Sequence, residues 1–358
     1  MEDNSNASKN LATLEIFFTK SLEHFDQACK TLKDKSSFYF SLANKQLVIH
    51  TAGKTLQETT CQALKHIEIS SPIQEVTSLE IFVWDEKESG INLPTHPWET
   101  PTDLVEDSFV QFNLAHYFVS QYDNLSILYI FNQQTNQAIC ILKDATTLNN
   151  SFISSPYFKI IAIWASKQKL NILHAGCVSI DNKAVLIVGR SGKGKSSTSV
   201  QCLIGGLNYL SDDYVLVDWN GENPIAYSLF NTGKLKNKHI ERFNKIQGEY
   251  KQGILDKNNK PLLFLYPLFK DKIRSSAEIK AIIVPNITSE SKASYHRISA
   301  AESLRALAPS TLIQLKINNL NQLNSLAKLT RTLPNYELNI GSDLDDISLK
   351  VKEIIDSL

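Results

Sequence analysis

The first 150 residues combine one helical pattern with several extended ones. Over residues 11–33, Leu, Ile and Phe recur at helical spacing among Lys and Glu, which predicts an amphipathic helix. Apolar runs at 38–42 and 46–50 flank Ala43-Asn44-Lys45, and because Asn tolerates the left-handed conformation, this segment predicts a β-hairpin. Further strands are predicted at 79–84, 126–131 and 138–143, and a proline-rich loop at 94–101. Residues 1–150 are therefore predicted to form an α+β domain.

From residue 151 onward, helical and extended patterns alternate. A helix is predicted over 156–169, before buried-strand runs at 176–180 and 184–188. Further strands are predicted near 214–218 and 279–285, and helices near 300–307, 320–333 and 344–358. Such alternation favours an α/β fold class with a largely parallel or mixed sheet. The predicted organisation is a smaller N-terminal α+β domain over 1–150 and an α/β domain over 151–358.

Length, composition and charge narrow the class of protein. The 358 residues are enough for about two domains. Lys and Arg together number 37, as do Asp and Glu, so the formal net charge is zero and no overall field attracts nucleic acid or anionic lipid. A hydrophobic fraction of 42% with 21% charged residues is typical of a globular chain and excludes a disordered or collagen-like one.

Neither a membrane span nor a disulfide framework is expected. The first ten residues are polar and lack the basic and apolar regions of a signal peptide, and the apolar runs are far shorter than the roughly 18 residues that a membrane helix needs. The five cysteines are widely separated and form no Cys-x-x-Cys pair, which predicts reduced, mostly buried thiols. These features predict a cytoplasmic protein without a membrane partner.

One segment matches the phosphate-binding pattern Gly-x-x-x-x-Gly-Lys-Ser: it is Gly189-Arg190-Ser191-Gly192-Lys193-Gly194-Lys195-Ser196. Glycines let such a loop curl so that several N–H groups converge on one anion, Lys195 places a charge beside the β and γ phosphates, and the Ser196 hydroxyl can ligate Mg²⁺. A buried-strand run precedes the loop and a helix is predicted from Ser197, as the mechanism requires. The sequence therefore predicts a site for ATP and Mg²⁺ formed by residues 189–197.

Two further sequence features are interpreted as functional because they lie near this loop in the sequence. Asp212 and Asp213 follow it closely, and paired acids beside a triphosphate suggest that one holds Mg²⁺ while the other accepts the proton of an attacking hydroxyl. An Asp-Asp pair alone is more often a solvated turn. His174 precedes the loop on a predicted neighbouring strand end, where an imidazole is useful near phosphate, although an isolated His usually satisfies local hydrogen bonds.

The order and spacing of His174, the loop and Asp212-Asp213 resemble the bacterial HPr kinase/phosphorylase superfamily, whose nucleotide-binding core is related to that of phosphoenolpyruvate carboxykinase. The resemblance implies that Lys195 and Ser196 bind phosphate and Mg²⁺. It also implies that Asp213 is the proton acceptor, Asp212 a metal-side acid and His174 an active-site residue. In several short sequence segments the chain also resembles a branch of HPr-kinase-like serine kinases, some of which phosphorylate lasso-type precursor peptides.

The chain also departs from that family. Lys238 stands where HPr kinases proper carry a further Mg²⁺-binding Glu, and Glu241 is a nearby candidate for that metal contact. The segment that the family uses for reverse phosphorolysis is not recognisable, and residues 1–150 do not resemble its N-terminal domain. HPr is therefore not the expected acceptor.

Several groups of basic and aromatic residues have both a functional and a structural interpretation. The stretch 234–251 contains seven basic side chains and two glutamates, which fits either a cationic groove for an acidic peptide or a solvated helix. Lys272 and Arg274 fit either a phosphate clamp or ordinary surface positions. Trp84, Trp98, Trp164 and Trp219 fit either stacking on a ligand or packing in the core, and core packing is the favoured interpretation.

The favoured interpretation is an ATP- and Mg²⁺-dependent kinase that transfers the γ-phosphate to a hydroxyl, with a serine of a peptide or protein as the favoured acceptor and a lasso-type precursor peptide as its class. One alternative is a kinase for a small hydroxyl compound such as free serine or a sugar alcohol. Another is a nucleotide-gated binding module without phosphotransfer. The sequence leaves open the acceptor, ATP versus GTP, the oligomeric state, reverse phosphorolysis and the role of residues 1–150.

Overall fold

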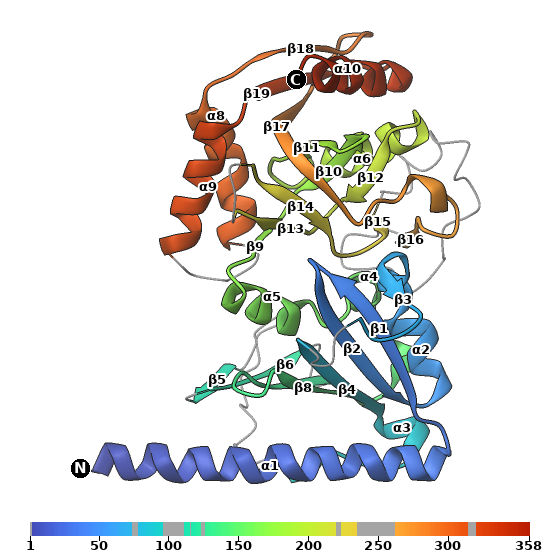
Figure 1. The fold of residues 1–358 in the computed structure, drawn as a ribbon, viewed down its shortest axis with the longest axis vertical. Helices are drawn as coiled ribbons and strands as arrows, with labels where there is room; N and C mark the ends of the chain where they lie inside the picture. The colour runs from blue at the N-terminus through green and yellow to red at the C-terminus, as the bar shows by residue number, and fades with distance from the viewer. Residues whose placement is uncertain are drawn as a thin grey trace. The chain divides into compact units, whose positions relative to one another are not determined.

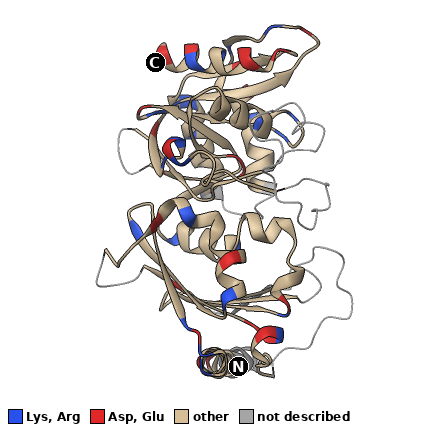
Figure 2. Cartoon of the chain, turned by 90° about the vertical axis from the view of Figure 1, so that its right-hand side faces the viewer, with Lys and Arg blue, Asp and Glu red and all other residues tan. Residues whose placement is uncertain are grey.

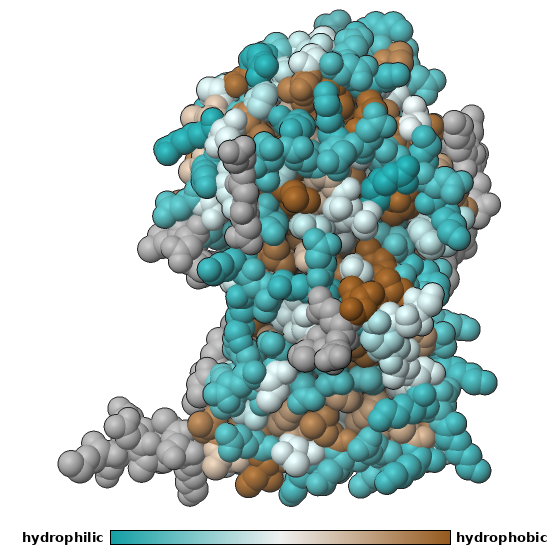
Figure 3. All heavy atoms as spheres, viewed as in Figure 1, coloured by the Kyte–Doolittle hydropathy of each residue, from teal (hydrophilic) through white to brown (hydrophobic). Residues whose placement is uncertain are grey.

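The computed structural model describes residues 2–73, 78–95, 111–114, 116–122, 126–219, 223–234, 262–313 and 320–358 (Figure 1). The chain folds into two compact units. Unit 1 comprises Met1–Gln62, Ile67–Leu148 and Pro156–Trp164, and unit 2 comprises Ala63–His66, Asn149–Ser155 and Ala165–Leu358. Charged residues of both signs are interspersed along the described chain (Figure 2). Hydrophilic residues cover most of the face drawn in Figure 3.

Unit 1 contains a mixed sheet that has eight strands among the described residues, in the order β3-β1-β2-β4-β8-β7-β6-β5. The strands are β1 (Ser36–Leu42), β2 (Lys45–Ala52), β3 (Glu68–Ile69), β4 (Leu79–Asp85), β5 (Gln111–Leu114), β6 (Tyr117–Tyr122), β7 (Ile127–Asn132) and β8 (Gln137–Leu142). The helical segments that begin between residues 1 and 158 are α1 (Glu2–Leu32), α2 (Lys54–Thr60), η1 (Gln62–Ile67), α3 (Glu86–Ser89), η2 (Ala145–Thr147), α4 (Asn150–Ser154) and α5 (Phe158–Lys167). The pairs β2–β4 and β4–β8 are parallel, and the other neighbours are antiparallel.

The amphipathic helix and the hairpin predicted for this part are both present. Helix α1 buries Phe17 and Phe25 in one cluster with Trp84 and Ile139 of the sheet, because its apolar residues recur on one face. The hairpin of β1 and β2 turns at Ala43 and Asn44, whose φ angles of 50° and 60° are those of a tight two-residue connection. Helix α1 begins well before the predicted residue 11.

Unit 2 is built around a second mixed sheet, with the strand order β12-β10-β11-β17-β14-β13-β9 and with β19 added to β17 and β18 to β19. Its strands are β9 (Asn171–Leu173), β10 (Gly176–Ile180), β11 (Lys183–Ile187), β12 (Asn208–Ser211), β13 (Val215–Asp218), β14 (Ile225–Ser228), β17 (Ser276–Ile287), β18 (Ser294–Arg297) and β19 (Asn335–Ile340). A separate pair consists of β15 (Thr232–Lys234) and β16 (Leu262–Phe264). The helical segments are α6 (Lys195–Ile204), η3 (Lys270–Lys272), α8 (Ala300–Ala308), the π-helix η4 (Pro309–Ile313), α9 (Leu320–Thr332) and α10 (Leu344–Asp356).

Helices lie on both faces of this sheet. Cys202 of α6 and Val351 of α10 pack in one cluster with Val185 and Ile283, whereas α8 and α9 pack in another cluster that contains Leu186. The parallel pairs β11–β17 and β17–β19, together with antiparallel neighbours, make the sheet mixed. The predicted α/β class with a mixed sheet is confirmed at this level.

Each of two short links connects an edge strand of the unit 2 sheet to a strand near the opposite edge. Strand β9 runs into β10 through His174 and Ala175, and β12 runs into β13 through residues 212–214. Because β9 pairs with β13 and β10 pairs with β12, the two links lie opposite each other within one long antiparallel ribbon. The sheet is therefore almost closed, and both links interrupt it at the same place.

Two negative expectations can be compared with the described residues. No helix in the described ranges is long and apolar enough to cross a membrane. All five cysteines are buried and none forms a disulfide in the structure, which confirms their predicted burial.

Candidate functional site

The segment 188–194 forms a tight loop between β11 and α6. The Val188 N–H donates to Ile283 O at 2.9 Å, which ends the strand pairing, and the chain then curls through three glycines. Gly192 and Gly194 have φ angles of 83° and 99°, a region that side chains rarely adopt. A Cβ at Gly194 would also lie 3.1 Å from Ile340 Cδ1, whereas one at Gly192 would meet open space. The loop is thus held at its end and exposed at its middle.

Lys195 turns back across this loop. Its Nζ donates to Gly189 O at 2.7 Å and lies 3.5 Å from Arg190 O, while only 6% of the residue is exposed. Burial of an ammonium group is costly unless polar atoms surround it, so the two carbonyls stabilise the charge at the loop. The charge stands at the first residue of a ten-residue helix, where the unsatisfied N–H groups and the dipole also favour an anion.

The remaining residues of the predicted loop lie around that charge. Arg190, Ser191, Gly192 and Lys193 are exposed, and Ser196 and Ser197 are half-buried in the first turn of α6. The donor set consists of a buried ammonium, an exposed glycine-rich backbone and a helix N-terminus. These groups fit a polyphosphate, and a hydroxyl in the first turn fits a ligand of Mg²⁺.

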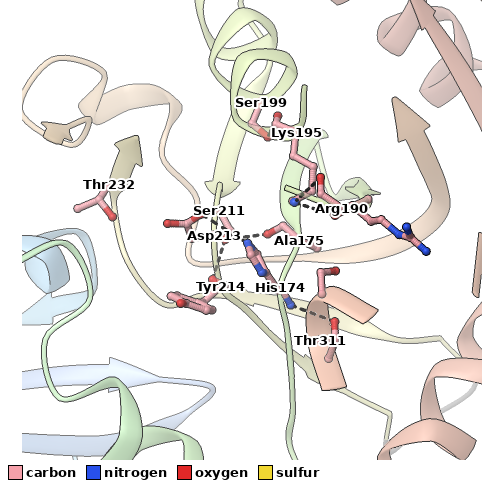
Figure 4. Close-up of polar contacts among 12 residues, drawn as sticks. His174, Ala175, Arg190, Lys195, Ser199, Ser211, Asp213, Tyr214, Thr232 and Thr311 are labelled. Carbon is pink, nitrogen blue, oxygen red and sulfur yellow. Dashed lines mark hydrogen bonds and ion pairs between the residues drawn. The ribbon is translucent and has the colours of Figure 1, made fainter. Parts of the chain in front are cut away.

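His174 and Asp213 contact each other across the two links. Nε2 of His174 lies 3.7 Å from Oδ1 of Asp213, and their side chains are 14% and 26% exposed (Figure 4). The His174 ring lies 5.7 Å from the Tyr214 ring. Its Nδ1 is buried and has no hydrogen-bond partner within the described ranges. One ring nitrogen of His174 therefore faces the Asp213 carboxylate, and the other is buried.

The backbone of His174 is held by a residue far away in the sequence. The His174 N–H donates to Thr311 Oγ1 at 3.3 Å, and the Thr311 side chain is fully buried. Thr311 belongs to the π-helix η4, a rare wide turn that follows α8 and that frequently occurs at functional sites. No role for Thr311 follows from the sequence alone, because nothing local in the chain links residues 174 and 311.

Strand alternation decides which way His174 faces. Leu173, Ala175 and Cys177 pack in one core cluster, so His174 and Gly176 lie on the opposite side. Helix α6 covers that opposite side closely, since a Cβ at Gly176 would lie 2.2 Å from Ser199 Oγ.

The direction of α6 follows from the same contacts. Ser199 is at Gly176, and Cys202 packs in one cluster with Val178, so α6 and β10 run the same way. The first residue of the helix, Lys195, therefore lies toward the His174 end of β10. Figure 4 shows Lys195, Arg190, His174 and Asp213 in this region.

The two aspartates have different surroundings. Asp212 is 1% exposed, whereas the Asp213 side chain is 26% exposed. Ser211 Oγ donates to Tyr214 O at 2.6 Å and so fixes the turn that carries both acids. Burial, with added repulsion from Asp212 and Asp213, raises the pKa of Tyr209 well above its usual value. A buried acid and a more exposed acid at one link fit different tasks.

No group of three or more His, Cys, Asp or Glu side chains within the described ranges could hold a metal ion by itself. Magnesium in phosphate sites usually takes one or two protein oxygens, with phosphate and water completing its shell. Ser196 and Asp212 are oxygen donors of that kind. Glu241 and Lys238 lie outside the described residues, as do Lys236, His239, Arg242, Lys245 and Lys251.

Lys272 is not near the loop end of α6. Lys272 Nζ donates to Gly206 O at 2.8 Å, just beyond the C-terminal end of the helix. A ten-residue helix is about 15 Å long, so Lys272 lies at the opposite end from the loop. Arg274 is half-buried: its Nη1 donates to Asp271 O at 2.9 Å, and its N–H donates to Tyr209 O of β12 at 2.9 Å. The surface interpretation therefore fits Lys272, and a phosphate clamp from Arg274 stays a prediction.

Comparisons with known proteins give little identity. No family model matches the sequence, and no curated protein matches it. Among solved structures, the chain is similar to the Hpr(Ser) kinase/phosphatase from Coxiella burnetii, with 14% sequence identity, a TM-score of 0.31, and coverage of 51% of this chain and 90% of that chain. Because that TM-score is low, the functional assignment below depends on the geometry of the site.

Proposed function

We propose that unit 2 is a kinase that uses ATP and Mg²⁺ to transfer the γ-phosphoryl group to a hydroxyl. The observation that supports this most is the location of three features at one end of one sheet. These are the loop with its buried Lys195, the His174–Asp213 pair and the turn that carries Asp212. Phosphoryl transfer needs little covalent chemistry from a protein and depends on positioning and charge stabilisation, which these groups can provide.

The loop and Lys195 would bind the polyphosphate. Backbone N–H groups of residues 189–197 would donate to phosphate oxygens, and the Lys195 ammonium would neutralise charge beside the β and γ phosphates. Ser196 and Asp212 would hold Mg²⁺, which supplies positive charge to the phosphates and draws them into one geometry. Arg190 and Lys193, which are exposed beside the loop, would add charge at its outer side.

Asp213 would accept the proton of the acceptor hydroxyl. As that oxygen forms its bond to the γ-phosphorus, the bond from phosphorus to the bridging oxygen breaks, and the hydroxyl proton passes to the Asp213 carboxylate. His174, 3.7 Å from Asp213, would orient that carboxylate and stabilise charge near it. Thr311 would keep His174 in place through its bond to the backbone.

The favoured acceptor is a serine hydroxyl of a peptide or protein, with a lasso-type precursor peptide as its class, because the sequence resembles serine kinases that modify such precursors. The part of Asp213 that remains accessible is where such a side chain would arrive. A small hydroxyl compound, or nucleotide binding without transfer, would be a different outcome of the same assay.

The test uses the full chain with Mg²⁺ and ATP labelled at the γ position, offered a serine-containing peptide or free serine. Transfer is expected for the wild type and loss of about 100-fold or more for Asp213→Asn, with nucleotide affinity unchanged. Asp181→Asn is the matched control, because Asp181 is an exposed turn residue with φ 49°, which Asn also tolerates. Near-full transfer by Asp213→Asn would contradict the proton-acceptor role, and nucleotide binding without any transfer would favour the binding module.

A further inference from the structure

A second concave site lies in unit 2, away from the loop. It is a cavity of about 250 Å³ between the β9–β13 pair and α9. Its described lining residues are Lys169, Asn171, Leu173, Val217, Trp219, Ser325, Leu326, Lys328 and Leu329. At about 30 Å³ for each water molecule, this volume holds roughly eight waters, which is the space of a small organic molecule.

The cavity follows from the periodicities of its three walls. Asn171 and Leu173 are two apart on β9 and so share a face, and Asn171 pairs with Val217 of β13. Trp219, the residue just after β13, lines the same cavity. The α9 residues lie at helical spacing on one face of that helix. Gln322 Nε2 donates to Ile172 O at 3.2 Å and so ties α9 to the edge strand. Regular elements therefore form the cavity walls.

The floor is apolar and the rim is polar. Leu173, Val217, Leu326 and Leu329 are at most 2% exposed and form the floor. The rim residues are Lys169, Asn171, Trp219, Ser325 and Lys328. An apolar cavity with a few polar groups at its mouth is typical of sites for small molecules.

The charge of the rim has one sign. Lys169 and Lys328 contribute two ammonium groups, and no carboxylate is among the described lining residues. Asp218 lies between Val217 and Trp219 in the sequence, so strand alternation directs it to the other face. Two ammonium groups at the mouth would favour a negatively charged group there.

Trp219 and Lys328 are arranged together. Lys328 Nζ lies 4.8 Å from the centroid of the Trp219 ring, and this cation–π contact holds both side chains at the rim. On the other side, Lys169 has a left-handed backbone with φ 61°, and its N–H donates to Ser166 O at 3.1 Å at the end of α5. The backbone of the second lysine is thus fixed as well.

This cavity is separate from the proposed nucleotide site. None of its described lining residues belongs to the loop or to the acid pair. Leu173 faces the core side of β9, whereas His174 faces the side covered by α6. A ligand in the cavity would therefore leave the loop accessible.

We propose that the cavity binds a small carboxylate carried on an apolar body of about the size of a benzene ring. The apolar body would lie on the four floor residues, and the carboxylate would accept hydrogen bonds from Lys169 and Lys328. The proposal does not depend on the kinase activity.

Binding of benzoate to the full chain in the absence of nucleotide tests this inference. Benzoate is compared by calorimetry with benzamide, which has the same shape without the charge, and with acetate, which has the charge without the ring. Benzoate is expected to bind about tenfold more tightly than either, because both the ammonium groups and the floor contribute. Equal binding of benzoate and benzamide, or no binding of benzoate, would overturn the proposal.

Variants locate the binding. Lys169→Gln with Lys328→Gln is expected to remove most of the preference for benzoate over benzamide, since both lysines are exposed and their loss spares the floor. Lys167→Gln, an exposed lysine outside the lining, is the matched control and should keep the preference. Quenching of tryptophan fluorescence by benzoate should disappear in Trp219→Phe. An unchanged preference in the double variant, or unchanged quenching in Trp219→Phe, would place the ligand elsewhere and refute the assignment.

Discussion

Nε2 of His174 lies 3.7 Å from Oδ1 of Asp213, although the two residues come from different strand links. The pairing of β9 with β13 and of β10 with β12 brings them together, because it sets the two links opposite each other. The contact is thus a property of the sheet register. Substitutions at such residues should therefore change phosphotransfer, nucleotide affinity or stability in the ways described below.

The first prediction concerns the imidazole. His174→Gln is expected to lower phosphotransfer by about 10- to 100-fold, because Asp213 loses its orienting neighbour. Nucleotide affinity should stay the same, since Lys195 and the loop are untouched. Steady-state kinetics with a separate nucleotide-binding measurement checks this.

His296 supplies a matched comparison for that variant. It also lies near a carboxylate, with Nε2 4.0 Å from Glu337 Oε1, but it is exposed and distant from the links. His296→Gln should leave transfer within about twofold of the wild type. Equal losses in both variants would mean that His174 has no special role.

The second prediction concerns the loop lysine. Lys195→Met keeps the length of the side chain but removes the charge, so nucleotide affinity is expected to fall by about tenfold or more. Lys183→Met is the control, because Lys183 is exposed at the first residue of β11, the end of that strand away from the loop. Titration with ATP followed by calorimetry measures both, and similar small losses would contradict the phosphate-binding role of Lys195.

The third prediction tests how α6 lies on β10. Gly176→Ala places a Cβ 2.2 Å from Ser199 Oγ, so it should lower the free energy of unfolding by about 1–3 kcal/mol. Ser199→Ala in the same chain should restore most of that loss, because the next atoms are 3.5 Å away. Urea denaturation of the single and double variants measures the coupling. Additive effects would mean that α6 lies elsewhere.

The fourth prediction concerns acid. Burial lowers the pKa of His66 from 6.5 to about 3, and its Nε2 lies 2.7 Å from Ser228 Oγ. The unfolded chain binds a proton near pH 6.5 and the folded chain does not until about pH 3, so stability is lost as the pH falls between these values. From pH 7 to pH 5 this one group should cost about 2 kcal/mol.

Urea denaturation at both pH values checks this, with His66→Gln as the comparison. The variant should lose less stability than the wild type on acidification, because glutamine does not titrate. An equal loss in both proteins would show that His66 is not the group responsible.

The sequence predicted local elements well and non-local ones poorly. The hairpin at Ala43 and Asn44 follows from two apolar runs and a turn residue, and α6 follows from the loop pattern before it. Strand β19 was not predicted, although Tyr336, Leu338 and Ile340 alternate with polar residues, because a helix and Pro334 precede it directly. Its place beside β17 depends on pairing with residues about fifty positions earlier.

The candidate site likewise combines residues from one short segment, which the sequence predicted, with contacts that depend on the fold. The loop residues share one short segment, so their spacing could be compared with a known pattern. The contact between His174 and Asp213 depends on the strand order. The hydrogen bond between the His174 N–H and Thr311 depends on a π-helix that no local sequence pattern predicts. The roles of Asp213 and Lys195 remain predictions that the experiments above address, and the roles of Asp212 and Ser196 in binding Mg²⁺ remain predictions.

The hydrogen bond from Lys195 Nζ to Gly189 O has a thermodynamic consequence. Since Nζ already donates to Gly189 O, an arriving anion competes with peptide oxygens as well as with water. The observed affinity is then the difference between two sets of contacts. A singly charged ion gains little from this exchange, whereas a multiply charged chain of phosphates gains at several donors at once. The loop would therefore discriminate by ligand charge before any base or acceptor is recognised.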